Sequence, residues 1–207
     1  MGEHRLQRLS GNHKRARAFY NKQMLDHLNP LMCDFISRQG MLFMSTADSR
    51  GECDCSFRYG PPGFVQVLDE KTLFYPELRG NGVMASLGNI SENPHIGMLF
   101  VDFFESTVGL HVNGKASIAE NDVQSGNPEL SEEILKQIAI DRERGPGRWV
   151  VIEVEEAYIH CAKHIPLLKK LDKEIYWGTD NGIHKGGDYF KAKVSPRPWS
   201  VVYKEPK

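Results

Sequence analysis

The 207-residue chain contains no apolar run long enough to cross a membrane. Its longest apolar stretches are strand-sized, such as residues 97–101, whereas a spanning helix needs about 20 apolar residues. The first residues are charged and polar, without the apolar core of a signal peptide. Charge of neither sign is in excess, because 26 Lys and Arg face 27 Asp and Glu. We therefore expect a cytoplasmic protein that binds neither membranes nor nucleic acid.

The sequence also lacks the signatures of the common catalytic and metal sites. It has no Walker loop, no GxGxxG after a strand, no HExxH and no GxSxG. Four cysteines occur without CxxC spacing, and Cys53 and Cys55 are expected to point to opposite faces of a strand and to serve in packing. His160 and His164 have no carboxylate or third His nearby, so no metal site is predicted.

The first 39 residues are predicted to form a helical extension. Residues up to 11 show no periodic apolar pattern and are expected to be mobile. Apolar residues at three- and four-residue steps then predict helix from 12 to 39. Pro30 should divide this helix, with Asn29 capping the second part. The basic residues between the apolar positions are interpreted as a solvated helix face.

Short alternating segments separated by turns predict a β-rich core. Strands are expected at 41–46, 53–57, 64–68, 72–75, 95–103, 107–119 and 148–160, and helices at 82–91, near 130–138 and at 165–171. Residues from 180 onward are expected to be a loop or an ordered arm. Because strands and helices do not alternate regularly, a doubly wound sheet is excluded. The prediction is one α+β domain over 1–207, with a β-barrel core and peripheral helices.

One candidate binding segment is Arg-Gly-Asn-Gly-Val-Met-Ala-Ser at 79–86, between a strand and a helix. Asn81 is a good helix cap, and the glycines expose backbone N–H groups where the helix dipole is positive. Such a terminus suits a phosphate, with Arg79 and Ser86 as additional donors. The alternative is an ordinary strand-to-helix turn.

Two further segments carry candidate binding residues. Arg58 ends a strand beside the proline-stiffened loop 60–63. There its guanidinium could present N–H donors in a fixed orientation to a planar acceptor. Alternatively, it is a surface arginine beside a turn. His111, Asn113 and Lys115 share one face of a predicted strand. This stripe either lines a site or forms the solvated face of an antiparallel sheet.

Taken in order, these segments resemble the pyridoxamine-5'-phosphate-oxidase-related branch of the FMN-binding split-barrel superfamily. The resemblance extends over roughly 35–177. It rests on Asp-Ser-Arg-Gly at 48–51, on the segments 56–67, 73–81, 86–100 and 110–116, and on His-Cys-Ala-Lys at 160–163 with the later Trp177.

The resemblance implies a six-stranded antiparallel split β-barrel that forms a homodimer with FMN at the subunit interface. The phosphate would be bound from the turn 81–86 and from the strand with His111 and Lys115. The ring would lie near Ser56, Arg58 and the loop leading to Phe64. The implied cofactor-binding residues are thus Ser56, Arg58, Phe64, Arg79, Asn81, Ser86, His111 and Lys115.

The implied activity is that of an FMN-dependent oxidoreductase with a small-molecule substrate. Val83 and His111 stand where close relatives tend to carry arginines, and the C-terminal Arg-Leu-His element of true pyridoxamine phosphate oxidases is absent. The latter difference argues against vitamin B6 synthesis. Three alternatives stay open: a non-catalytic flavin or haem binder with His111 or His160 as axial ligand, a deazaflavin-dependent reductase, and a dimeric scaffold without cofactor.

Overall fold

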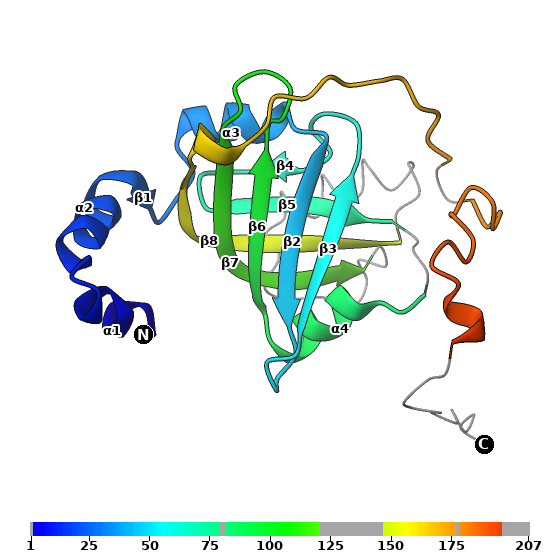
Figure 1. Ribbon diagram of the computed structural model, residues 1–207, viewed down its shortest axis with the longest axis horizontal. Helices are drawn as coiled ribbons and strands as arrows, with labels where there is room; N and C mark the ends of the chain where they lie inside the picture. The colour runs from blue at the N-terminus through cyan, green and yellow to red at the C-terminus, as the bar shows by residue number, and fades with distance from the viewer. Residues whose placement is uncertain (1, 79–81, 121–146, 177–178, 196–207) are drawn as a thin grey trace. The chain divides into compact units, whose positions relative to one another are not determined.

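The computed structural model describes residues 2–78, 82–120, 147–176 and 179–195 (Figure 1). The chain divides into two compact units, residues 1–171 and 172–207. The first unit contains every described strand and α-helix, whereas the described part of the second contains one short 3-10 helix, Ala192–Val194. Within the described ranges, no helix combines the length and apolarity that crossing a membrane requires.

The first unit is built on an antiparallel sheet with the strand order β3-β2-β6-β7-β8-β5-β4, and β1 pairs with β8. Seven of its eight strands overlap the expected ones, with β4 lying inside the expected strand 64–68, and the two-residue strand β1 is additional. An α+β fold with an antiparallel sheet is confirmed, and closure of the sheet into a barrel stays a prediction. The strands are β1 Met24–Leu25, β2 Met41–Ala47, β3 Cys53–Tyr59, β4 Gln66–Val67, β5 Thr72–Glu77, β6 His95–Val101, β7 Gly109–Glu120 and β8 Arg148–His160.

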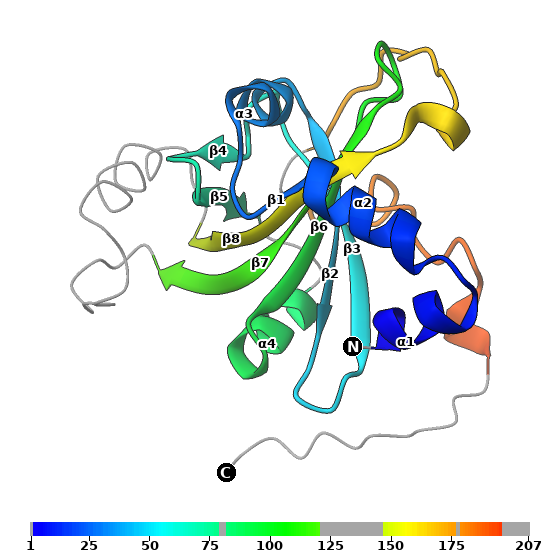
Figure 2. The same cartoon turned by 90° about the vertical axis from the view of Figure 1, so that its left-hand side faces the viewer.

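In the described part of the chain, four α-helices accompany the sheet: α1 Gly2–Leu9, α2 His13–Gln23, α3 Pro30–Ser37 and α4 Ala85–Glu92. The predicted helix start at Pro30 is confirmed, because the Asn29 side chain accepts the Met32 N–H at 3.0 Å. Figures 1 and 2 place α3 and α4 at opposite ends of the strands. Both helices contribute buried residues to the same apolar core as the inward-facing strand residues.

Two helix predictions were wrong. Residues 2–9 form α1, which has no buried residue and is joined to α2 by polar contacts that apolar periodicity cannot reveal. Residues 165–171 are not helical, because Pro166 restricts Ile165 and the Leu168 N–H donates to the Phe103 carbonyl at 2.7 Å. The predicted helix near 130–138 lies outside the described residues.

The two cysteines of β3 lie on the same face of the strand, and not on opposite faces as expected. Cys53, Cys55 and Phe57 are all exposed, whereas the residues between them are partly buried. The prediction that the two cysteines point to opposite faces was wrong, because residues two apart on a strand share a face. We call the side of the sheet with Cys55 the outer face.

A row of mostly apolar side chains crosses the outer face from β3 to β8. The pairing registers align Phe57 with Phe43, Phe43 with Leu99, Leu99 with His111, and His111 with Tyr158. The Phe43 and Phe57 ring centroids lie 5.4 Å apart, and these rings are 37% and 52% exposed. This outer row therefore leaves apolar surface uncovered in a single chain.

The turn between β6 and β7 is organised by Asp102. Its carboxylate accepts four hydrogen bonds of 2.7–3.1 Å, from the N–H groups of Phe104, Glu105 and Ser106 and from the Ser106 hydroxyl. Burial alone raises the pKa of Asp102, but these hydrogen bonds outweigh it and lower the pKa to about 2. The ionised carboxylate is therefore a fixed structural element of this turn.

Replacing Asp102 by Asn is expected to destabilise the protein at pH 7 by about 2 kcal/mol. Because the pKa is lower in the folded state than the ordinary 3.8, this stabilisation is complete above that value and is lost as the pH falls towards 2. Urea unfolding should therefore show a smaller difference between variant and wild type at pH 3 than at pH 7. Asp34→Asn, on the exposed face of α3, is the control and should change stability by less than about 0.5 kcal/mol. A difference for Asp102→Asn that does not depend on pH would contradict the assignment.

Candidate functional site

A cluster of three polar side chains connects β3 with α4. The Ser86 hydroxyl donates to the Asp54 carboxylate at 3.0 Å, and the Ser56 hydroxyl lies 3.2 Å from both groups. Ser86 is buried, and Asp54 and Ser56 are partly buried on the inner face of β3. The expected proximity of Ser56 and Ser86 is thus observed, with Asp54 between them. Asp54 was not predicted, although its position two residues before Ser56 places it on the same face.

Arg58 continues this face of β3 and forms an ion pair with Glu77 of β5. Its Nη2 lies 3.2 and 3.1 Å from the two Glu77 carboxylate oxygens, and both side chains are about one-fifth exposed. Among the described residues, the buried Nε of Arg58 has no hydrogen-bond partner. A buried donor without a partner is costly, so this atom is a place where a ligand acceptor would be stabilising.

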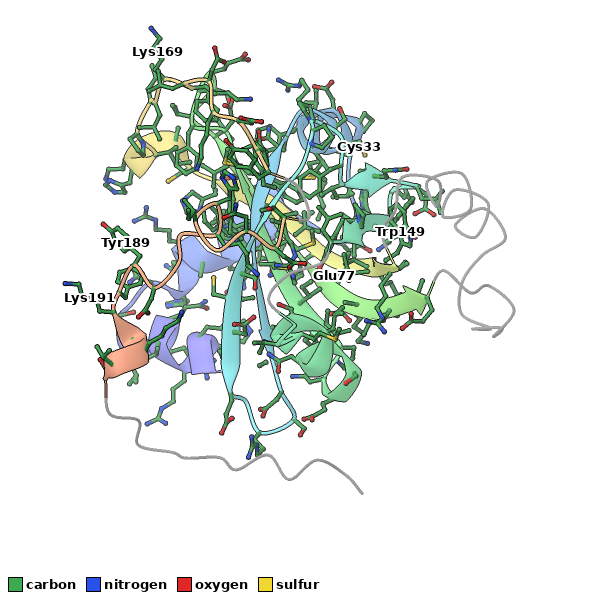
Figure 3. The ribbon with its side chains drawn as sticks, turned by 90° about the vertical axis from the view of Figure 1, so that its right-hand side faces the viewer. Cys33, Glu77, Trp149, Lys169, Tyr189 and Lys191 are labelled. Atoms are coloured by element: carbon green, nitrogen blue, oxygen red, sulfur yellow. The ribbon has the colours of Figure 1, made fainter. Side chains whose placement is uncertain are left out.

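The buried phenol of Tyr75 lies on β5, two residues before Glu77. Burial raises the pKa of Tyr75, so the phenol stays protonated, and its hydroxyl donates to the Met44 sulfur at 3.2 Å. Figure 3 shows Glu77 and Trp149 on this side of the molecule, and Trp149 packs edge-on against Phe74 at 5.6 Å. Tyr75 therefore supplies a buried aromatic side chain on the same face of β5 as Glu77, and the Phe74–Trp149 contact lies on the other face.

The N-terminus of α4 has no side-chain cap. The helix begins at Ala85 rather than near residue 82, and its N-cap, Met84, adopts a left-handed conformation with φ of 56°. Its first N–H groups therefore donate no hydrogen bond to the N-cap side chain, which leaves them available to an anion. The predicted contributors Arg79 and Asn81 lie outside the described residues.

Phe64 has a packing role in the loop after β3. Its ring is partly buried against the core, and its N–H donates to the Pro61 carbonyl at 3.0 Å. A Cβ at Gly60 would lie 2.5 Å from Phe64 Cβ, so glycine is required for this close approach. The structure thus accounts for Phe64 as the residue that fixes the loop 60–63.

His111 and Lys115 lie on the outer face of β7, where both contact β8. His111 Nε2 is 2.9 Å from His160 Nδ1, and its ring stacks on Tyr158 with centroids 4.7 Å apart. Lys115 Nζ is 3.2 Å from the Glu155 carboxylate. Burial, and then the proximity of His160, lowers the pKa of His111, which keeps this imidazole neutral near pH 7.

The predicted site residues thus fall on two faces of the sheet. Ser56 and Arg58 face inward, whereas His111 and Lys115 share the outer face with Phe57, as the strand registers require. In the described part of the chain, no hydrogen bond or ion pair joins the two groups. No set of three or more His, Cys, Asp or Glu side chains there is placed to hold a metal ion. A single chain therefore does not unite these residues in one site.

Comparisons with solved structures find several proteins with related architecture. HupZ from Group A Streptococcus is 26% identical, with 62% of this chain and 90% of that chain covered and a TM-score of 0.45. The heme storage protein HutZ from Vibrio cholerae is 17% identical, covering 64% and 93%, with a TM-score of 0.42. General Stress Protein 26 from Bacillus anthracis is 19% identical, covering 61% and 88%, with a TM-score of 0.40. At these TM-scores, the likenesses assign no ligand to this chain.

A search of curated proteins finds no match. The sequence profile of the pyridoxamine 5'-phosphate oxidase family, however, matches residues 28–161, which run from the residue before the Asn29 cap to the end of β8. This span includes strands β2 to β8, α3 and α4, and both groups of polar residues described above. The chain therefore belongs to the pyridoxamine 5'-phosphate oxidase family.

Proposed function

We propose that this protein binds FMN and acts as an oxidoreductase on a small-molecule substrate. The observation that carries the proposal is the buried Arg58 Nε, which has no partner among the described residues while Glu77 fixes the guanidinium. A flavin ring carries acceptors along its pyrimidine edge, which suit a positioned arginine donor. When bound, a flavin supplies two-electron redox chemistry, to which the protein adds orientation and a positive charge near the ring.

The carboxylate of Asp54 indicates which part of the cofactor would contact the polar cluster. With Ser86 donating to it and Ser56 within 3.2 Å, the cluster presents acceptor oxygens and a negative charge. Such a group accepts hydrogen bonds from ribityl hydroxyls or a ring N–H, and it repels a phosphate. We therefore place the ring and ribityl chain near Asp54, Ser56 and Arg58. The phosphate would lie toward the uncapped start of α4.

A homodimer would resolve the separation of the predicted site residues. His111 and Lys115 lie on the opposite face of the sheet from Arg58, so they could complete its site only from a second copy. The outer row offers exposed aromatic surface for such an association, and exposed apolar patches of this kind are typical of interaction sites. We propose that the β3–β2 end of the outer row, with Phe57 and Phe43, lies in the dimer interface.

Phe57→Lys is expected to convert the dimer to a monomer. It places a charge in the middle of an apolar contact, and hot-spot losses of about 2 kcal/mol or more weaken association at least about thirtyfold. Sedimentation equilibrium at micromolar concentration measures the effect. Leu31→Lys, on an exposed apolar residue of α3 outside the outer row, should remain dimeric. A wild-type monomer, or a dimer of the Phe57→Lys variant, would contradict the interface.

Haem binding is the second candidate, and the His111–His160 pair favours it. A neutral, partly buried imidazole is the form of histidine that ligates iron, and burial lowers the pKa of His111 toward that form. One histidine of the pair would ligate, and the other would orient it through the 2.9 Å contact.

Absorbance spectra of the protein, recorded after incubation with FMN or with hemin and removal of the unbound ligand, and then with dithionite, test the proposal. Two retained flavin bands that bleach on reduction would support the flavoprotein assignment. A single sharp Soret band would favour haem instead. A spectrum that stays featureless after both incubations would refute both and leave the dimeric scaffold as the better account.

A further inference from the structure

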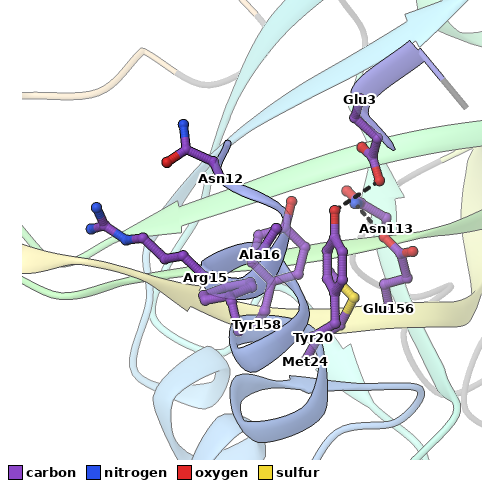
Figure 4. Close-up of a pocket in the computed structure, with 10 residues that line it drawn as sticks. Glu3, Asn12, Arg15, Ala16, Tyr20, Met24, Asn113, Glu156 and Tyr158 are labelled. Carbon is purple, nitrogen blue, oxygen red and sulfur yellow. Dashed lines mark hydrogen bonds between the residues drawn. The ribbon is translucent and has the colours of Figure 1, made fainter. Parts of the chain in front are cut away.

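A cavity of about 650 Å³ lies between the N-terminal helices and the outer face of β7 and β8 (Figure 4). Small-molecule sites in proteins commonly have volumes of about 300–1,000 Å³. Helix residues, among them Phe19 and Tyr20, form one side, and strand residues, among them Glu156 and Tyr158, form the other. None of the lining residues belongs to the flavin site proposed above.

Contacts between several elements hold the walls of this cavity in place. The Tyr20 hydroxyl of α2 donates to the Glu3 carboxylate of α1 at 2.9 Å and accepts from Gln7 at 2.6 Å. The Phe19 ring meets Tyr158 of β8 edge-on, with centroids 5.8 Å apart and an interplanar angle of 83°. Met24 of β1 pairs with Tyr158 in the sheet. The helices are thus tied to one another and to the sheet around the cavity.

The lining is acidic. Glu3 and Glu156 contribute two carboxylates to the lining (Figure 4), and Arg15 is the single cationic side chain of the lining. Glu156 accepts one hydrogen bond, from Asn113 at 3.2 Å, and Glu3 accepts one from Tyr20 and lies 3.7 Å from His4. An ionised carboxylate has about four acceptor positions, so both retain capacity for a ligand donor.

Aromatic rings form the rest of the recognition surface. Tyr158 is held by stacking on His111 at 4.7 Å with an interplanar angle of 18°, so its ring has a fixed orientation. Cations are attracted to the faces of aromatic rings, and planar ligands stack on them. Carboxylates beside aromatic faces thus suit a ligand that combines a flat ring with a positive charge.

We propose that this cavity binds a small arylalkylamine, in which a flat ring carries a protonated aliphatic amine. The ammonium group lies between Glu3 and Glu156, and the ring packs against Phe19, Tyr20 and Tyr158. The proposal does not depend on the flavin assignment, because the cavity shares no residue with that site.

Isothermal titration calorimetry of the full chain with tryptamine tests the proposal. Glu3→Gln and Glu156→Gln should each weaken tryptamine binding about tenfold, since each removes a charge-assisted hydrogen bond. Glu153→Gln, an exposed glutamate of β8 outside the lining, is the matched control and should leave binding unchanged. Because α1 has no buried residue, a loss in Glu3→Gln cannot be attributed to unfolding of the core.

Indole-3-propionate provides the second comparison. It carries the same ring system with a carboxylate in place of the ammonium, and it should bind at least about tenfold more weakly than tryptamine. Equal binding of the two probes would overturn the proposal. So would tryptamine affinity that neither glutamine variant changes, or the absence of tryptamine binding at millimolar concentration.

Discussion

Replacing Arg58 and Ser86 together by alanine is expected to strip FMN from the protein while the fold persists. The double variant removes the guanidinium with the partnerless Nε and a hydroxyl of the polar cluster, from two elements that flank the proposed ring position. Hydrogen bonds to charged groups contribute about 1.5–3 kcal/mol and neutral ones about 1, so affinity should fall about a hundredfold or more. Quenching of flavin fluorescence on titration with protein measures this loss directly.

The matched control for that experiment is the double variant Arg50→Ala and Ser91→Ala. Arg50 lies in the exposed turn between β2 and β3, and Ser91 is exposed on α4, so the same residue types are removed from neighbouring positions. Circular dichroism should show unchanged folding in both proteins. Full flavin occupancy in the Arg58 and Ser86 double variant would show that the site lies elsewhere.

Gly114→Ala is expected to be the most damaging single substitution in the sheet. Gly114 lies at the irregularity between β7 and β8, where an added Cβ would be 2.0 Å from the Glu153 carbonyl oxygen and 3.2 Å from Val154 Cα. These atoms belong to the backbone of a central strand and cannot rotate away. Since ordinary overpacking costs about 1–3 kcal/mol, we expect a loss of at least about 3 kcal/mol. The midpoint of urea unfolding measures it.

Gly88→Ala is expected to have the opposite effect on the stability of the protein. Gly88 lies within α4, and no atom is within 4 Å of its hypothetical Cβ. Alanine there should stabilise the protein by about 0.5–1 kcal/mol, because glycine is the weaker helix former. A Gly114→Ala protein as stable as wild type would mean that β7 and β8 approach one another less closely than described.

Local patterns in the sequence predicted much of the sheet because its strands alternate clearly. The start of α3 was equally predictable, since Asn29 and Pro30 form a cap and first turn with few alternatives. β1 was not, because this two-residue strand exists only through its pairing with β8. α1 depends on contacts with α2 and carries no periodic signal of its own.

The candidate site was predictable residue by residue but not as an arrangement. Arg58 was identified from its position at a strand end, yet its partner Glu77 lies 19 residues away and is reached only across the fold. The contact between His111 and His160 depends on the register of β7 and β8, and on Gly109, where a Cβ would lie 2.9 Å from His160 Cβ. Register between distant strands is a tertiary property, which short motifs do not encode.

The place of β3 at the end of the strand order has a consequence for solubility. Among the described strands, β3 pairs only with β2, so no described strand pairs with its other backbone edge. Exposed edges with apolar side chains act as templates for aggregation, and β3 carries Phe57 and two thiols on its outer face. We therefore expect a destabilised protein to aggregate through this strand first, and a lysine at position 57 to slow that aggregation.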